Sequence, residues 1–408
     1  METIIIGKPA MNVYLPLQEF PEEGDIFLIR TKNESVGNVG ATSACLLAKW
    51  GMSTHFTGVT GNDAYAEKIR DTFKTYKVNS KFMETDFESN TAINYYILNA
   101  KSGVVTKILY NDIDSCLKKF KYDFIPNFAV IDGTDVAGAF ALLNNNGSVK
   151  TVFYGRTGDK DTITLSKRCT WSVVTEKFCE MLTKMECDGS AEGYVNLYQK
   201  IVDVSGQSNY IVILNSHKIL YCVDGKVKML PEMKINNVDS SSFDSIFVGA
   251  LSFALMNEVE LDDAIKLANT AAAISQTKIG EVEAIPEIDE VLDNSGLREK
   301  LGLAKKQINV AATPVAVQPL NPNVTVNTGG SAVQVQTQAE NIATTQDAFN
   351  TVPNMANQNV EMPMQATSQV AAQPQVVNQT QNQNTTQPGM NPVPMPEVQQ
   401  VQNINQNV

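Results

Sequence analysis

The segment DSSSFDSIFVGA (239–250) places hydroxyl and carboxylate side chains directly before an apolar stretch with helical spacing. This pattern predicts a polar turn followed by a helix. The first turn of a helix presents unpaired backbone N–H groups and the positive end of the helix dipole, which together bind phosphate or a developing anion. We therefore predict an anion site at this helix start, formed by Ser241, Ser242 and Phe243.

Asp244, in the same turn, has two interpretations. Ser241 and Asp244 are three residues apart and precede an apolar run, which matches a capping box, in which the carboxylate accepts a hydrogen bond from a backbone N–H group at its own helix start. We favour this interpretation. In the alternative, Asp244 faces a ligand and acts as a displaced general base. We expect Ser245 to be a first-turn helix residue rather than a nucleophile, because no histidine lies near it in sequence.

The elements that position this turn follow an alternation of strand and helix patterns. Short apolar runs recur along the chain, and several of them precede a stretch with helical spacing, which predicts a mostly parallel sheet covered on both faces by helices. The predicted strands lie within 3–7, 128–133, 149–155, 171–175 and 210–215, and the predicted helices include 41–51, 64–77 and 261–280.

Two stretches depart from this alternation. Residues 25–31 and 91–110 alternate apolar and polar side chains, and the second stretch turns at Lys-Ser-Gly. They predict antiparallel strands of a small accessory sheet that forms a lid over a pocket at the C-terminal ends of the main strands. An ordinary edge hairpin is the alternative.

Five segments, in this order along the chain, resemble the pfkB or ribokinase-like carbohydrate kinases. They are VGNVGATSACLLAKWG (36–51), TGVTGNDAYAEKIR (57–70), VILNSHKILYCVDGKVKMLP (212–231), VDSSSFDSIFVGALSFAL (238–255) and ANTAAAISQTKIGEVEAIP (268–286). The resemblance extends to about residue 293. It implies a ribokinase-like α/β fold with a small antiparallel β lid, ATP-dependent phosphorylation of a sugar or nucleoside hydroxyl, and ATP with Mg²⁺ in an active enzyme.

The resemblance also assigns residues to the acceptor site. The catalytic base of the family, an aspartate, falls on Ser245, its acceptor-binding aspartate on Asn12, and the asparagine that follows its Gly-Ala pair on Thr42. Gly37 and Gly40 either bring the backbone close to a bound ligand, which we favour, or permit a tight turn into the helix.

Further positions match the nucleotide and metal sites of the family. Asn215, His217 and Asn269 fall at nucleotide-binding positions, and an exposed turn histidine is the commoner alternative for His217. The family motif that organises Mg²⁺ would follow residues 171–174, where Glu176 or Glu180 could substitute, although neither has the expected spacing.

The centre of the catalytic motif differs from the family pattern. Its Gly-Ala-Gly is replaced by Ser242-Phe243-Asp244, which adds bulk and a negative charge where glycines would let N–H groups approach phosphoryl oxygens. Serine is also a poor base near neutral pH, and loss of a general base typically costs about 10²- to 10⁴-fold in rate. We therefore predict a carbohydrate-kinase-family protein with weak or lost catalysis. The alternative is a non-catalytic small-molecule-binding protein or scaffold that acts through its lid and tail.

Composition divides the 408 residues into two parts. Every Lys, Arg, Cys, His and Trp lies at or before Lys306, and the rest is rich in Gln, Asn, Thr, Val and Pro. We predict a ribokinase-like domain over 1–305 and a disordered tail over 306–408. The charged side chains after Lys306 are four carboxylates, which leaves a net charge of −8 on residues 1–306 and argues against nonspecific nucleic-acid binding.

The remaining features concern compartment and partners. The six cysteines lack metal-type spacing, and no apolar stretch approaches the length of a membrane span. These features predict a cytoplasmic protein without nucleic-acid or membrane partners. The family resemblance adds a small sugar or nucleoside as ligand and a homodimer formed through paired lids.

Overall fold

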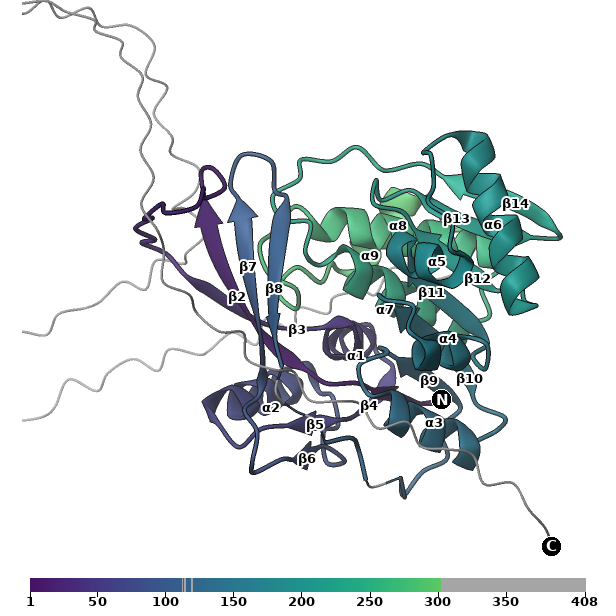
Figure 1. Cartoon of the computed structure of the whole chain (residues 1–408). Helices are drawn as coiled ribbons and strands as arrows, with labels where there is room; N and C mark the ends of the chain where they lie inside the picture. The colour runs from purple at the N-terminus through teal and green to yellow at the C-terminus, as the bar shows by residue number, and fades with distance from the viewer. Residues whose placement is uncertain (112, 114, 119, 302–408) are drawn as a thin grey trace, which may run out of the picture. The chain divides into compact units, whose positions relative to one another are not determined.

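The computed structural model describes residues 1–111, 113, 115–118 and 120–301. Their main element is an eight-stranded sheet in the order β14-β13-β12-β11-β10-β9-β1-β4 (Figure 1). The pairs from β4 to β12 are parallel, whereas β13 and β14 add antiparallel strands at one edge. The strands are β1 (Glu2–Ile6), β4 (Ser53–Thr57), β9 (Phe128–Ile131), β10 (Lys150–Gly155), β11 (Trp171–Thr175), β12 (Tyr210–Ile213), β13 (Ile219–Val223) and β14 (Lys226–Leu230). The predicted mostly parallel sheet is confirmed.

Helices cover both faces of this sheet, which explains why its strands are apolar at nearly every position. In β1, Ile5 packs into the core on one face while Ile4 and Ile6 pack into the core on the other. The first face carries α1 (Val39–Lys49), α2 (Ala64–Tyr76), α7 (Phe243–Met256), α8 (Leu261–Ser275) and α9 (Ile288–Ser295). The second face carries α3 (Val136–Asn145), α4 (Lys160–Ser166), α5 (Glu176–Thr183) and α6 (Ala191–Ser205).

Helix α7 lies inside the molecule between α1 and α8. Every one of its residues except Asp244 is buried. A Cβ atom on Gly249 would lie 3.1 Å from Cα of Ser43, so this glycine allows α7 to approach α1 closely. The close packing fixes the first turn of α7, where the anion site was predicted.

A four-stranded lid projects from the sheet, in the order β3-β2-β7-β8 (Figure 1). Its strands are β2 (Ala10–Leu17), β3 (Asn33–Gly37), β7 (Ala92–Asn99) and β8 (Val105–Tyr110). The predicted hairpin at 91–110 is confirmed as β7 and β8. Because β2 and β7 are parallel, the lid is mixed rather than purely antiparallel. A short pair, β5 (Val59–Thr60) and β6 (Glu84–Thr85), forms a separate two-stranded sheet.

The prediction of a strand at 25–31 is wrong. Residues 25–31 contain no strand, and the side chains of Ile26 and Leu28 are 98% and 83% exposed. The alternation is present, but no neighbouring strand pairs with it. The two lid strands that the sequence analysis missed, β2 and β3, lie on either side of this segment.

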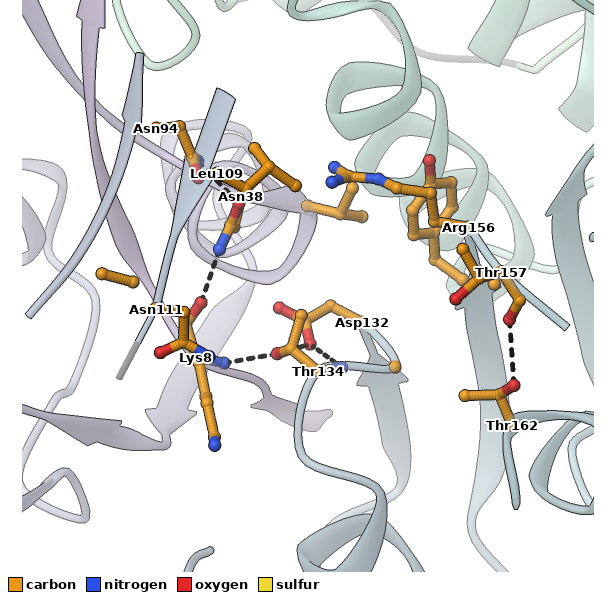
Figure 2. A pocket seen from close by; sticks show the side chains of 15 residues that line it. Lys8, Asn38, Asn94, Leu109, Asn111, Asp132, Thr134, Arg156, Thr157 and Thr162 are labelled. Carbon is orange, nitrogen blue, oxygen red and sulfur yellow. Dashed lines mark hydrogen bonds between the residues drawn. The ribbon is translucent and has the colours of Figure 1, made fainter. Parts of the chain in front are cut away.

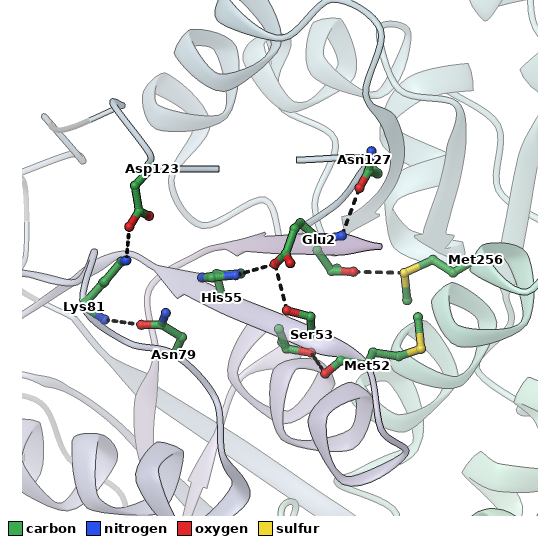
Figure 3. Close-up of polar contacts among 11 residues, drawn as sticks. Glu2, Met52, Ser53, His55, Asn79, Lys81, Asp123, Asn127 and Met256 are labelled. Carbon is green, nitrogen blue, oxygen red and sulfur yellow. Dashed lines mark hydrogen bonds and ion pairs between the residues drawn. The ribbon is translucent and has the colours of Figure 1, made fainter. Parts of the chain in front are cut away.

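His55 has a structural role at the β1–β4 edge (Figure 3). Its Nε2 lies 2.7 Å from Oε2 of Glu2, which also accepts a 2.7 Å hydrogen bond from the hydroxyl of Ser53. The imidazole ring stacks on Phe124 at 3.9 Å between ring centroids. One of the two histidines of the chain is therefore held in structural contacts, away from the predicted ligand site.

The tail predicted from residue 306 lies outside the described residues. Within the part of the chain that the structure describes, no helix combines the length and the apolar character needed to cross a membrane.

Candidate active site

Two cavities lie between the lid and the C-terminal ends of the parallel strands. The first, of about 290 Å³, is bounded by the ends of β1, β9 and β10 and by β7 and β8 (Figure 2). Its polar lining consists of Lys8, Asn38, Asn94, Asn111, Asp132, Thr134, Arg156, Thr157 and Thr162. The second, of about 200 Å³, lies at the ends of β11 and β12 and is lined by Lys107, Thr175, Ile213, Leu214, Asn215, His217, Ser240, Ser241 and Asp244.

Beside these cavities, four elements converge on one buried carboxylate, that of Glu281, which is 1% exposed. Its Oε1 accepts hydrogen bonds from Nδ2 of Asn12 and from the hydroxyl of Tyr96, both at 2.9 Å. Its Oε2 accepts from the hydroxyls of Thr42 at 2.8 Å and Ser245 at 2.9 Å. An ionised carboxylate has about four acceptor positions, and all four are used here.

Three residues predicted from distant segments therefore meet: Asn12, Thr42 and Ser245. They meet on a side chain of the chain itself, and none of them lines either cavity. The sequence analysis missed Glu281 and Tyr96. The available signal was a glutamate between Gly280 and the apolar Val282, since a charged side chain that is buried with such a neighbour requires partners.

The loop that carries Glu281 is held in place by its backbone. The N–H of Gly280 donates to Oδ2 of the buried Asp239 at 3.0 Å, and the N–H of Glu281 donates to the hydroxyl of Ser35 at 3.1 Å. The hydroxyl of Tyr76 donates to the carbonyl of the following residue at 2.7 Å. Burial raises the pKa of Asp239. These contacts leave the Glu281 side chain little freedom to move away.

The start of α7 differs from the predicted capping box. Ser242 is the N-cap residue, but its side chain makes no capping hydrogen bond and instead lies 2.8 Å from the hydroxyl of Ser275. Asp244 accepts a hydrogen bond of 2.5 Å from the hydroxyl of Tyr154. The capping-box interpretation is wrong, because the buried tyrosine at the end of β10 supplies a donor that the carboxylate accepts. Asp244 consequently faces the second cavity.

Two cations lie near Asp244. Burial lowers the pKa of the Arg156 guanidinium, but the neighbouring Tyr154, Tyr96 and Asp244 more than offset that effect, so the net shift is upward. Nζ of Lys107, from the lid, lies 3.4 Å from the carbonyl of Ser241 and 5.0 Å from the ring centroid of Tyr96. Side-chain cations thus lie beside the region where the sequence predicts an anion.

Asp132 is the buried carboxylate of the first cavity, and the sequence analysis did not single it out. It accepts hydrogen bonds from the N–H and hydroxyl of Thr134 at 3.0 and 2.5 Å (Figure 2). It also accepts one from the N–H of Gly40 at 3.3 Å. Burial raises the pKa of Asp132 to about 6.

The two glycines of the α1 entrance allow neighbouring side chains to approach the backbone. A Cβ on Gly40 would lie 2.7 Å from Oδ2 of Asp132, and a Cβ on Gly37 would lie 1.9 Å from Nδ2 of Asn12. Their predicted contact with a ligand stays a prediction.

Two of the three residues predicted for the nucleotide lie together, and the third lies elsewhere. Asn215 and His217 line the second cavity, whereas Asn269 is buried within α8 and lines neither cavity. His217 is half-buried and stacks on Phe243, with centroids 4.3 Å apart and planes 8° from parallel. The prediction of an exposed histidine is therefore wrong. Burial also lowers the pKa of His217.

The comparisons with known proteins agree with this architecture. Residues 3–288 match the model of the pfkB family carbohydrate kinases. The chain belongs to the pfkB family of carbohydrate kinases. It is 20% identical over 304 residues to a ribokinase from Staphylococcus aureus, covering 71% of this chain and 98% of that protein. It is also 20% identical over 317 residues to a deoxyribokinase from Salmonella typhi, covering 73% and 100%.

Solved structures of the family share the fold. An Arabidopsis thaliana ribokinase complexed with ribose and ATP superposes with a TM-score of 0.59 at 18% identity, covering 72% of this chain and 98% of that one. A nucleoside kinase from Methanocaldococcus jannaschii superposes with a TM-score of 0.55 at 12% identity, covering 72% and 98%. The predicted family and ribokinase-like fold are confirmed.

For a pfkB family member, the site fits Mg²⁺ poorly. The carboxylate of Glu176 accepts the N–H of Asn215 at 2.9 Å, and Glu180 pairs with Lys177 at 3.1 Å; neither glutamate lines the two cavities. Among residues 1–301 as described, no cluster of three or more His, Cys, Asp or Glu side chains could hold a metal. Mg²⁺ is usually bound by one or two carboxylates together with substrate phosphates. The carboxylate that lines the second cavity is that of Asp244, and its Oδ2 accepts a hydrogen bond from Tyr154.

Proposed function

We propose that this pfkB family member binds a sugar-like or nucleoside-like small molecule beneath its lid and transfers phosphoryl groups weakly or not at all. The observation that carries the proposal is the environment of Ser245, at the family's base position. Ser245 is buried, donates its hydroxyl proton to Glu281 and lines neither cavity. A hydroxyl in this arrangement is a poor acceptor for a substrate proton near neutral pH.

The first cavity supports the ligand part of the proposal. Its volume of about 290 Å³ lies at the lower end of the range for small-molecule pockets. Its amide, hydroxyl and carboxylate side chains can both donate to and accept from the hydroxyl groups of a polyol. It also lies at the C-terminal ends of adjacent parallel strands, where open α/β sheets generally bind ligands.

One observation favours the enzymatic alternative. Asp244 faces the second cavity and is not bonded to its own helix start, so a carboxylate is present close to the predicted phosphoryl position. In this alternative Asp244 is the displaced base. The second cavity also contains Lys107, which would attract an anion, although the carboxylate of Asp244 opposes it.

Measuring ADP release from Mg-ATP in the presence of ribose, deoxyribose and nucleosides would separate these alternatives. The unaltered protein is compared with Asp244→Asn and with Asp161→Asn, an exposed carboxylate of α4. We expect ligand binding by calorimetry without turnover above background. Sugar-dependent turnover that Asp244→Asn abolishes and Asp161→Asn retains would overturn the proposal and identify Asp244 as the base.

We further propose a homodimer formed through the lid. In β8, Lys107 and Leu109 face the cavities, so Ile108 and Tyr110 lie on the opposite face, where they are 55% and 41% exposed. Tyr95 pairs with Ile108 in the neighbouring strand and extends this apolar face. A second copy of the chain would bury it. Sedimentation analysis should give a dimer that Ile108→Lys dissociates, and a monomer at every concentration would contradict it.

The proposed compartment is the cytoplasm, on the strength of the cysteine pattern.

A further inference from the structure

The contacts of Glu281 join the lid to the body of the molecule. Two of its four donors, Asn12 of β2 and Tyr96 of β7, belong to the lid. The other two, Thr42 of α1 and Ser245 of α7, belong to helices packed on the main sheet. One carboxylate therefore connects four elements that are distant in sequence, and it does so with 1% of the residue exposed.

The hydrogen bonding is complete. Each donor is neutral, and together they satisfy the acceptor positions of an ionised carboxylate without water. The amide of Asn12 is itself oriented, because its Oδ1 accepts a 2.8 Å hydrogen bond from Nδ2 of Asn94 while its Nδ2 points to Glu281. A hydroxyl group entering this position would have to displace the carboxylate from all four partners.

The charges of the surrounding residues agree with this arrangement. The family resemblance places aspartates at positions 12 and 245, where this chain has Asn12 and Ser245. Carboxylates at both positions would lie within hydrogen-bond distance of Glu281, where like charges disfavour the ionised forms. Relative to the family pattern, this chain has neutral donors at these two positions and a carboxylate from the loop after α8. The two differences are consistent with each other.

We propose that Glu281 is an internal ligand: its side chain occupies the acceptor position between Asn12, Thr42 and Ser245, and the four donors form a carboxylate-binding site filled in cis. The inference rests on the proposed function only where it identifies this position with the binding site of the sugar that would accept a phosphoryl group. The carboxylate site itself rests on the four hydrogen bonds. The sugar-like ligand of the proposed function would then bind in the first cavity, which Asn94 also lines, and not between these four donors.

Chemical rescue of Glu281→Ala tests this inference. The substitution leaves four donors facing a space the size of a small carboxylate. We expect a melting temperature lower by roughly 5 °C or more. Formate or acetate should then raise the melting temperature of Glu281→Ala in a saturable way, and by more than sodium chloride at equal ionic strength. The unaltered protein should show no such carboxylate-specific gain.

Two variants provide controls. Glu283→Ala removes a nearby glutamate that accepts a hydrogen bond from Ser35, and it should gain nothing from acetate. Glu281→Gln keeps the side-chain volume, so it should be destabilised but not rescued, and it serves as the test if Glu281→Ala does not fold. Equal acetate responses in all variants, or full stability of both Glu281 variants, would overturn the inference.

The rescue is measured without ATP, so it is independent of the test of the proposed function. If the unaltered protein phosphorylates a sugar and Glu281→Ala is still rescued, the proposed weak catalysis is wrong and the internal carboxylate site stands. If no turnover occurs and no rescue is seen, the proposed function stands and the internal ligand is wrong.

Discussion

Tyr154, at the C-terminal end of β10, donates a hydrogen bond of 2.5 Å to Asp244, in the first turn of α7. This contact replaces the local capping bond that the spacing of Ser241 and Asp244 predicts. It connects the central sheet directly to the start of the buried helix, and it turns a carboxylate toward the cavity instead of toward the backbone. Burial raises the pKa of the Tyr154 hydroxyl well above its usual value, which keeps it a donor at any ordinary pH.

Tyr154→Phe should therefore destabilise the protein by about 1 to 2 kcal/mol, since hydrogen bonds to charged groups contribute more than neutral ones. Urea unfolding of Tyr154→Phe, Asp244→Asn and the double variant would measure the coupling between the two side chains. We expect the double variant to be less destabilised than the sum of the single variants by about 1 kcal/mol. Strict additivity would mean that the contact contributes nothing.

The fold could be predicted because its main signals are local. The apolar runs of β1, β9, β10, β11 and β12 form strands that are covered on both faces, and the length of each run was sufficient to identify it. Strand β2 was missed because it follows β1 after only three residues and contains Pro16, which is unfavourable in a strand interior. Residues 25–31 were assigned to a strand on alternation alone, which does not reveal whether a partner strand is present.

The candidate site could be predicted only in part, because its decisive contacts are long-range. Asn12, Thr42 and Ser245 were identified through the family resemblance, but their common partner lies 269, 239 and 36 residues away in sequence. Asp244 was assigned to the wrong partner for the same reason: Tyr154 is 90 residues distant, and no local pattern encodes that contact.

Asp132 should make stability depend on pH. Burial raises its pKa from 3.8 to about 6 in the folded protein. Its contribution is therefore most favourable below about pH 4 and is lost as the pH rises to 6, by up to about 3 kcal/mol. The free energy of unfolding of the unaltered protein and of Asp132→Asn can be measured with urea between pH 4.5 and 8. The unaltered protein should lose stability relative to Asp132→Asn as the pH rises through 6, and the two pH curves should be parallel above pH 7. Parallel curves throughout would contradict the prediction.

The pKa of Asp86 is shifted in the opposite direction to that of Asp132. The hydroxyl of Ser115 donates to its Oδ2 at 2.8 Å, and this hydrogen bond lowers the pKa of Asp86. The stabilisation that Asp86 provides should consequently be lost as the pH falls, so Asp86→Asn and Asp132→Asn should shift the pH dependence in opposite directions.

Gly37→Ala should disturb the acceptor region without straining the backbone. Its Cβ would lie 1.9 Å from Nδ2 of Asn12, so the amide would have to leave Glu281. We expect a loss of about 2 to 4 kcal/mol, as for other changes that leave a buried charge short of a partner. Gly147→Ala is the control, because a Cβ there meets nothing within 4 Å. A difference below about 0.5 kcal/mol between the two variants would contradict this account.

Restoring an aspartate at position 245 should not restore a base by itself. In Ser245→Asp, a second carboxylate would face Oε2 of Glu281, which now accepts the serine hydroxyl at 2.9 Å. Two buried like charges at this distance should cost about 2 to 4 kcal/mol beyond the effect of side-chain size. Ser245→Asn, which matches aspartate in volume but is neutral, reports the effect of the larger side chain without the added charge.

The charge repulsion should disappear when Glu281 is also replaced. Glu281→Ala also frees space and removes the hydrogen-bond partner of Ser245, so part of the cost of either substitution should fall in that background. The charge repulsion is the additional part: replacing Glu281 should relieve Ser245→Asp by at least about 2 kcal/mol more than it relieves Ser245→Asn. Only the double variant presents both a free acceptor position and a carboxylate at the family's base position. Any sugar-dependent ADP release gained through the aspartate should therefore appear in the double variant and not in Ser245→Asp. Equal costs of Ser245→Asp in the two backgrounds would show that Glu281 does not occupy the space that an aspartate base requires.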